Sequence, residues 1–214
     1  IVIGGGAGGT SAAIQSARNG AKTLLIEETD WLGGMLTSAG VSAVDGNYKL
    51  PSGFWGEFKD SLVSHYGSLE ALKTGWVSNT LFEPRVGNQI LKSIAKNENN
   101  LKILFSTEVN SVTKLDLHKT GHYNFNVKSS KANFSSKVLI DATELGDVLP
   151  MIDEDYDLGM DSREMYSEDI APEKNNDIIQ DLTFVMILKN YNRSVKIEKP
   201  KNYDPSEFYC STAS

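Results

Sequence analysis

The feature that most constrains the fold is a run of glycines three residues into the sequence. Gly4, Gly6 and Gly9 match the pattern G-x-G-x-x-G directly after the apolar run 1–3. We expect residues 1–3 to form a buried parallel strand and residues 7–19 to form a helix that stops at the next glycine. In this pattern the first glycine permits a tight turn, the second lets the backbone approach a pyrophosphate, and the third allows close helix packing. The pattern therefore predicts a dinucleotide site at the helix N-terminus, where free N–H groups and the helix dipole favour an anion.

An acidic residue at the end of the next apolar run supports this prediction. Residues 22–27 (K-T-L-L-I-E) read as a second buried strand, which completes a βαβ unit. Glu27 lies 23 residues after Gly4 (27 − 4), near the spacing of a carboxylate that accepts ribose hydroxyls. Glu27 and its neighbour Glu28 would repel a 2′-phosphate, so NADP is disfavoured at this site and either NAD or FAD remains.

The rest of the hydrophobic pattern predicts the architecture. Helices are expected over 53–66 and 85–97, short strands over 101–105, 108–115, 123–128 and 131–136 with a turn at 118–122, and a returning parallel strand over 138–142. We predict an α/β fold: a Rossmann-like FAD/NAD(P)-binding domain with a doubly wound parallel sheet and a small antiparallel β insertion over about 108–136. This domain is expected to cover residues 1–150. The apolar run 182–188 is expected to begin a second, substrate-binding domain over 151–214, which the chain contains only in part.

Composition excludes several classes of protein. The 214 residues carry a net charge of −7 with no Lys/Arg cluster, which disfavours a nucleic-acid-binding surface. The single cysteine, Cys210, excludes an internal disulfide and a Cys-based metal centre, and the scattered histidines predict no metal site. No apolar run approaches the roughly 18 residues that span a membrane, and no signal peptide is visible. We expect a soluble protein, cytoplasmic or periplasmic, whose first strand is truncated and whose association into a homo-oligomer is left open.

The segment after the second strand bears on the choice of dinucleotide. Residues 31–40 (W-L-G-G-M-L-T-S-A-G) place two glycine-containing turns in a long loop, and loops of such length are usually functional or disordered. An extended loop of small residues can lie along a ligand that continues from the pyrophosphate toward a bulky ring.

Six segments together carry a family resemblance. They are I-V-I-G-G-G-A-G-G-T-S-A-A (1–13), L-L-I-E (24–27), W-L-G-G-M-L-T-S-A-G-V (31–41), F-E-P-R-V (82–86), I-D-A-T-E-L-G-D (140–147) and A-P-E-K (171–174). With these motifs the sequence resembles the FAD-dependent oxidoreductases of the glutathione-reductase-like fold. More narrowly, it is similar to the bacterial group often labelled xanthan lyase-associated FAD-dependent oxidoreductases.

The resemblance implies an FAD, which we expect to be bound non-covalently because no histidine or cysteine stands in a context that forces a covalent link. Its adenosine would lie at residues 4–9 and Glu27, its pyrophosphate and flavin end along 33–40, and its adenine beside the backbone of Val109. The family ends its returning strand in Ala-Thr-Gly, whereas this sequence has Ala-Thr-Glu at 142–144. Arg85 is equally well read as a cation near the cofactor or as a surface partner of Glu83. The expected cofactor-binding residues are Gly4, Gly6, Ala7, Gly8, Gly9, Glu27, Glu28, Gly33, Gly34, Met35, Leu36, Ser38, Arg85, Val109, Ala142, Thr143, Gly146 and Asp147.

The expected function is that of an FAD-dependent oxidoreductase, in which the flavin carries hydride to or from a small-molecule substrate. The sequence identifies neither the substrate nor the electron acceptor. No catalytic residue is predicted, because the resemblance implies that most of the substrate-facing part follows residue 214. Two alternatives remain at this point: an NAD-dependent dehydrogenase, and a dinucleotide-binding module without catalytic turnover.

Overall fold

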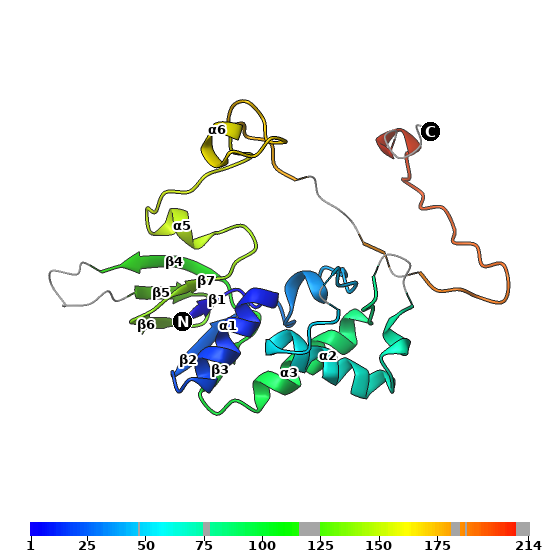
Figure 1. Cartoon of the computed structure of the whole chain (residues 1–214), viewed down its shortest axis with the longest axis horizontal. Coiled ribbons are helices and arrows are strands. Elements are labelled where there is room, and N and C mark those ends of the chain that lie inside the picture. The colour runs from blue at the N-terminus through cyan, green and yellow to red at the C-terminus, as the bar shows by residue number, and fades with distance from the viewer. Residues whose placement is uncertain (47, 75–77, 116–124, 181–184, 187, 209–214) are drawn as a thin grey trace.

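Two β-sheets organise the chain in the computed structural model, which describes residues 1–46, 48–74, 78–115, 125–180, 185–186 and 188–208. The larger sheet is parallel, in the order β3-β2-β1-β7, and consists of β1 Val2–Ile3, β2 Thr23–Ile26, β3 Leu101–Leu104 and β7 Ile140–Asp141. The smaller sheet is antiparallel, in the order β4-β5-β6, and consists of β4 Val109–Lys114, β5 Phe125–Ser129 and β6 Asn133–Ser136. The predicted antiparallel insertion before a returning parallel strand is therefore confirmed (Figure 1).

The parallel sheet has the strand order of one half of a doubly wound dinucleotide-binding fold. Val2 of β1 pairs with Leu25 on one side and with Ile140 on the other. Helix α1, Ala7–Arg18, connects β1 to β2, and the chain then crosses to β3 on the far side of β2. The order 3-2-1-4 results, with β7 in the fourth position, and it confirms the predicted Rossmann-like class.

Two further helices lie between β2 and β3. Helix α2, Gly53–Tyr66, has the predicted bounds and ends at Gly67, whose φ of +86° is the left-handed conformation common just after a helix. Helix α3, Pro84–Lys96, begins one residue earlier than expected because Pro84 takes the first helical position, where a missing N–H costs nothing. Two short 3₁₀ segments, η1 Gly34–Leu36 and η2 Glu70–Leu72, complete this connection. Figure 1 shows α2 and α3 side by side, away from the antiparallel sheet.

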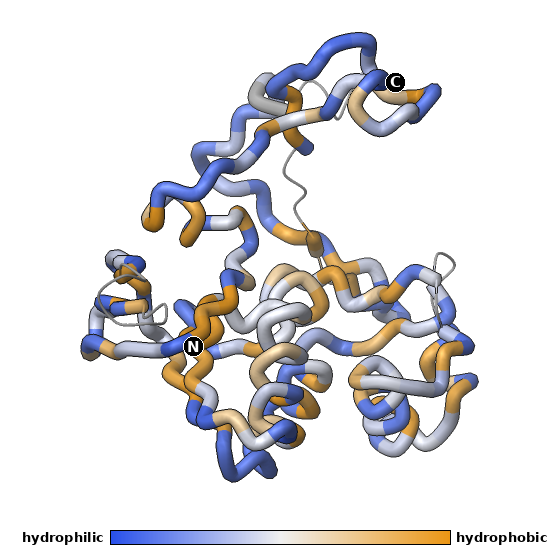
Figure 2. The backbone as a smooth tube through the Cα atoms, turned by 60° about the vertical axis from the view of Figure 1, so that its left-hand side comes forward, coloured by the Kyte–Doolittle hydropathy of each residue, from blue (hydrophilic) through white to orange (hydrophobic). Residues whose placement is uncertain are grey.

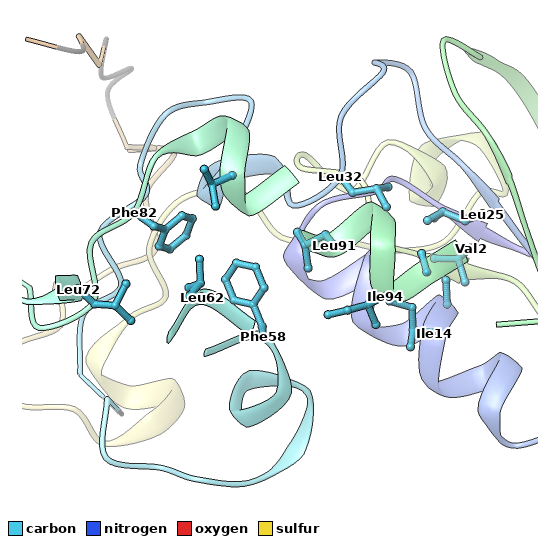
Figure 3. Packing of buried hydrophobic residues seen from close by; sticks show 13 residues of the cluster. Val2, Ile14, Leu25, Leu32, Phe58, Leu62, Leu72, Phe82, Leu91 and Ile94 are labelled. Atoms are coloured by element: carbon cyan, nitrogen blue, oxygen red, sulfur yellow. The ribbon is translucent and has the colours of Figure 1, made fainter. Parts of the chain in front are cut away.

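The core has three layers because successive strand residues point to opposite faces of the parallel sheet. Val2 and Leu25 pack against the helices, together with Ile14 of α1 and Leu91 of α3 (Figure 3). On the other face, Ile3 and Ile26 pack against residues of the antiparallel sheet, Val112 and Val127 among them. Figure 2 shows the hydrophobic character of the strands around the N-terminus. Burying each such side chain contributes roughly 1.5–3 kcal/mol. Because residues of both sheets belong to this cluster, the antiparallel insertion forms part of the core.

Beyond β7 the described chain contains little regular structure. It forms two one-turn helices, α5 Val148–Met151 and α6 Arg163–Tyr166, and a 3₁₀ segment, η3 Pro205–Phe208. The strand expected over 182–188 falls partly outside the described residues, and the described ones, Val185, Met186 and Leu188, are in no strand. The turn expected at 118–122 also lies outside the described residues. Among the helices that the structure describes, none combines the length and apolar character needed to cross a membrane.

An arginine at the end of α1 joins the two helices of the β2–β3 connection. The Arg18 guanidinium donates two hydrogen bonds to the Glu57 carboxylate of α2, at 2.7 and 2.8 Å, and one to Glu98, just after α3, at 2.7 Å. These contacts hold the pKa of Glu57 below its usual value of 4.5, chiefly through the hydrogen bonds from Arg18. Because the folded state favours the charged form of Glu57, this contribution to stability is present above that pH and is lost as the pH falls through the lowered pKa.

We therefore predict that Glu57→Gln lowers the free energy of unfolding at pH 7 by less than about 1 kcal/mol, since the pair is partly exposed. The difference from the wild type should shrink as the pH falls below 4.5. Denaturant titrations between pH 7 and pH 3 measure this. The matched control is Glu70→Gln, because the Glu70 side chain is 79% exposed and pairs with Lys73 three residues away in the chain, so it should change stability little. If the difference in the free energy of unfolding between the wild type and Glu57→Gln did not change with pH, this account would be contradicted.

Candidate functional site

A cavity of about 710 Å³ opens at the carboxyl ends of the parallel strands. Its wall includes Gly4 after β1, Glu27 after β2 and Ala142 after β7, together with Val109 at the start of β4. Ligands of open α/β sheets bind at this edge, outside the carboxyl ends of the strands. The volume also lies within the range of small-molecule sites.

Two glycines bring the chain segments of this edge closer together than any side chain would permit. Gly4 has a φ of +95°, and a β-carbon there would lie within 3.0 Å of Ala142 and Thr143 backbone atoms. A β-carbon on Gly9 would lie within 3.0 Å of Ala142 and of the Gly4 carbonyl. The roles predicted for these residues, a tight turn at Gly4 and close helix packing at Gly9, agree with this geometry.

Gly6, in contrast to Gly4 and Gly9, is not crowded by other protein atoms. It is the N-cap of α1 with a φ of −58°, which any residue can adopt, and a β-carbon there would meet nothing within 4 Å. Gly6 lines the cavity, so its backbone is accessible from inside it. Helix α1 is 12 residues long, and the N–H groups of its first turn have no partners within the helix. The arrangement is suited to an anion that approaches the backbone.

The peptide groups of Gly5 hold the glycine loop in place. Its N–H donates to Glu27 Oε2 at 2.6 Å, and its carbonyl accepts from Thr10 Oγ1 and from the Gly33 N–H, both at 2.8 Å. Thr10 is in α1, Glu27 follows β2, and Gly33 belongs to the long loop. Three separate segments thus fix the conformation of the loop before any ligand binds.

The long loop is held against the glycine loop from the other side by α3. The buried Asn88 side chain accepts a hydrogen bond from the Leu32 N–H at 2.9 Å. A β-carbon on Gly33, whose φ is +106°, would collide with Leu91 of α3 and with Thr37. The next residues of the loop then contribute to the cavity wall, namely Gly34, Met35, Ser38 and Ala39.

The turn after β7 is organised by the Asp141 side chain. Oδ1 accepts hydrogen bonds from the Thr143 N–H at 3.0 Å and the Thr143 hydroxyl at 2.7 Å, and Oδ2 accepts one from the Val148 N–H at 3.2 Å. The Thr143 hydroxyl also accepts from the Asp147 N–H at 2.8 Å. Because these bonds use the hydroxyl within the turn, Thr143 shapes the wall of the cavity at this point.

The charges of the wall are all of one sign. The described residues that line the cavity include five carboxylates and no lysine, arginine or histidine; the carboxylates are those of Glu27, Glu28, Glu108, Glu144 and Asp147. An anionic ligand would therefore depend on backbone N–H groups and the α1 dipole rather than on basic side chains. Among the described residues, no three His, Cys, Asp or Glu side chains are grouped so that they could hold a metal ion.

The structure brings many of the predicted site residues to the wall of this cavity. They are Gly4, Gly6, Glu27, Glu28, Gly34, Met35, Ser38, Val109, Ala142, Thr143 and Asp147. The others are not part of the wall: Ala7, Gly8, Gly9, Gly33, Leu36, Arg85 and Gly146. Arg85 is exposed near the start of α3, and its suggested partner Glu83 instead accepts a hydrogen bond from the Tyr66 hydroxyl at 3.0 Å.

Several wall residues were missed by the sequence analysis. Thr29 follows Glu27 by two residues and lines the cavity, as do Thr107 and Glu108 between β3 and β4. The E-x-T spacing of Glu27 and Thr29 could have indicated Thr29, because a threonine two residues after a carboxylate can donate a hydrogen bond to that carboxylate. Thr107 and Glu108 carry no such signal.

Comparison with known proteins gives one family. The family described as FAD dependent oxidoreductase matches residues 1–213. No curated protein matches the chain.

Solved structures give weaker similarity over part of the chain. L-proline dehydrogenase from P. horikoshii is 15% identical with a TM-score of 0.46, over 75% of this chain and 57% of that one. Bacillithiol disulfide reductase from Staphylococcus aureus is 22% identical with a TM-score of 0.41, over 66% and 36%. A crystal structure of OTEMO with FAD and NADP is 17% identical with a TM-score of 0.42, over 66% and 24%. The chain spans about a third of the length of the bacillithiol disulfide reductase, and about a third of the length of the thioredoxin reductases from Lactococcus lactis and Bacillus anthracis that it also matches.

The close approach at Gly4 leads to a prediction about stability. Gly4→Ala should lower the free energy of unfolding by more than about 2 kcal/mol, because it combines an unfavourable φ with a collision against backbone. Thermal or denaturant unfolding of the variant measures the loss. A variant as stable as the wild type would show that β7 does not approach Gly4 this closely.

Proposed function

This chain belongs to the family of FAD-dependent oxidoreductases, and from that membership we propose that its cavity binds FAD for flavin-dependent redox chemistry on a small-molecule substrate. The ribose of the adenosine would be held by Glu27, the adenine would lie near Val109, and the pyrophosphate would lie against Gly6 and the α1 N-terminus. The flavin end would follow the loop toward Ser38. When bound, the isoalloxazine ring supplies the hydride chemistry, and the protein supplies orientation and electrostatics.

The observation that carries the proposal is the contrast among the three motif glycines. Gly4 and Gly9 have no room for a side chain because protein atoms fill the space, whereas a β-carbon on Gly6 would meet no protein atom within 4 Å, and Gly6 lines the cavity. A ligand that needs close contact with the backbone explains why glycine is present at Gly6, since neither its φ nor its packing requires glycine. A pyrophosphate beside the N–H groups of a helix N-terminus is such a ligand.

The acidic wall supports FAD over NADP as the dinucleotide. Glu27 and Glu28 both line the cavity where the ribose is proposed to bind, and among the described lining residues no basic side chain would offset a 2′-phosphate. The loop residues Gly34, Met35, Ser38 and Ala39 extend the wall beyond the glycine loop, which supports a cofactor with a bulky group past its pyrophosphate.

We also propose that residues 1–150 form the FAD-binding domain and that residues 151–214 belong to a second, substrate-binding unit. Both hydrophobic clusters consist of residues up to Ile152. In the described chain beyond that point, apolar side chains such as Leu158, Ile170 and Ile197 are exposed rather than part of these clusters.

We predict that Gly6→Val abolishes FAD binding without unfolding the protein. A valine side chain would occupy the empty space at Gly6, and the affinity for FAD should fall by more than about 100-fold, equivalent to roughly 2.8 kcal/mol. Fluorescence titration with FAD measures the affinity, and thermal unfolding checks the fold.

The matched control is Gln15→Val, which places the same side chain on the exposed face of the same helix. Gln15→Val should bind FAD as the wild type does, and the two variants should unfold at similar temperatures. A Gly6→Val protein that still holds stoichiometric FAD would refute the proposed position of the pyrophosphate.

A further inference from the structure

The two oxygens of the Glu27 carboxylate are not equivalent. Oε1 accepts hydrogen bonds from the Thr29 N–H at 2.8 Å and from the Thr29 hydroxyl at 2.6 Å. Oε2 accepts one hydrogen bond, from the Gly5 N–H at 2.6 Å. An ionised carboxylate offers about four lone-pair sites, two on each oxygen. The described residues therefore fill both lone-pair sites of Oε1 and leave one acceptor site of Oε2 free.

The orientation of the Thr29 hydroxyl follows from its neighbours. Its oxygen accepts from the Trp31 N–H at 3.0 Å. Its single proton can go either to Glu27 Oε1 at 2.6 Å or to the Trp31 carbonyl at 3.4 Å. The shorter contact, to a charged acceptor, is much the stronger one. The hydroxyl thus donates to Glu27, and the Trp31 N–H keeps it turned that way.

The Thr29 backbone is itself held to the end of β3, so the threonine is a rigid support. Its carbonyl accepts from the Ser106 N–H at 2.8 Å, and the Glu27 carbonyl accepts from the Thr107 N–H at 3.0 Å. Glu27 is 8% exposed and lines the cavity, as Thr29 does. A hydroxyl donor for the free site of Oε2 is therefore expected from a ligand in the cavity.

We infer that Glu27 binds the adenosine ribose of FAD through Oε2 alone, and so accepts a hydrogen bond from one of the two ribose hydroxyls instead of both. Thr29 is the positioning residue that withholds Oε1 from the ligand and sets the rotation of the carboxylate. This inference rests on the proposed function and adds to it the way in which the site recognises ribose.

The first test uses nucleotides that lack one hydroxyl. ADP, 2′-deoxy-ADP and 3′-deoxy-ADP are used to displace FAD from the wild-type protein. We expect the removal of one hydroxyl to weaken binding by at least about tenfold, as for a hydrogen bond to a charged group, and the removal of the other to have a much smaller effect. If both deoxynucleotides bound equally more weakly than ADP, or if both bound as tightly as ADP, the inference would be overturned. Binding of FAD in the same experiment would still support the proposed function. A wild-type protein that binds neither FAD nor ADP would overturn the proposed function itself.

The second test addresses Thr29. Thr29→Val keeps the shape of the side chain and removes the hydroxyl, which frees one lone pair of Oε1, so the two deoxynucleotides should come to bind with similar affinities. Thr29→Ser keeps the hydroxyl and should preserve the wild-type preference. A merely structural role would weaken all three nucleotides together without changing their ratio, and that result, or an unchanged preference in Thr29→Val, would overturn the role of Thr29. If thermal unfolding shows that Thr29→Val is not folded, Thr29→Ala, which also lacks the hydroxyl, is used to compare the affinities of the two deoxynucleotides.

Discussion

The absence of side chains at Gly4 and Gly9 is the constraint on which the rest of the structure depends. With no β-carbons at these positions, the end of β1, the first turn of α1 and the end of β7 approach to backbone contact. That approach places the α1 N-terminus directly at the carboxyl edge of the sheet, where open α/β folds bind their ligands. The cavity lies at this edge, and its wall includes the residues that directly follow β1, β2 and β7.

Hydrogen bonds of the glycine loop hold these segments in one conformation. The peptide groups of Gly5 bond to α1, to the residue after β2 and to the long loop, so the loop that faces a ligand is formed in advance. Preorganisation of this kind lowers the entropic cost of binding. It also suits a wall whose described residues include carboxylates but no basic side chain, since fixed N–H groups would then be the main source of positive potential for the proposed pyrophosphate.

The sequence predicted those features that depend on short-range patterns. Glycine spacing indicated the strand–turn–helix unit, alternating or continuous apolar residues indicated the strands, and Pro84 marked the beginning of α3 within one residue. The carboxylate at Glu27 was expected at the site from its distance along the chain alone, and it lines the cavity.

Other features depend on contacts between distant segments, which leave no periodic signal. The bond from the Leu32 N–H to Asn88 joins residues 56 apart in the chain. Arg85 is a second example. The sequence predicted that it lies at the start of a helix, but it could not predict that this end of the helix does not contribute Arg85 to the cavity wall. The E-x-T spacing indicates that Thr29 can bond to Glu27, but only the geometry of the carboxylate shows that one of its oxygens already accepts two hydrogen bonds.

The most direct test of the central claim, that the cavity holds FAD, is a visible absorption spectrum of the purified protein before and after thermal denaturation. The account predicts a flavin spectrum in the native protein and the release of FAD into solution on heating, in a one-to-one ratio with the chain. A protein that is colourless as purified, and remains so after incubation with FAD and removal of the excess, would contradict it.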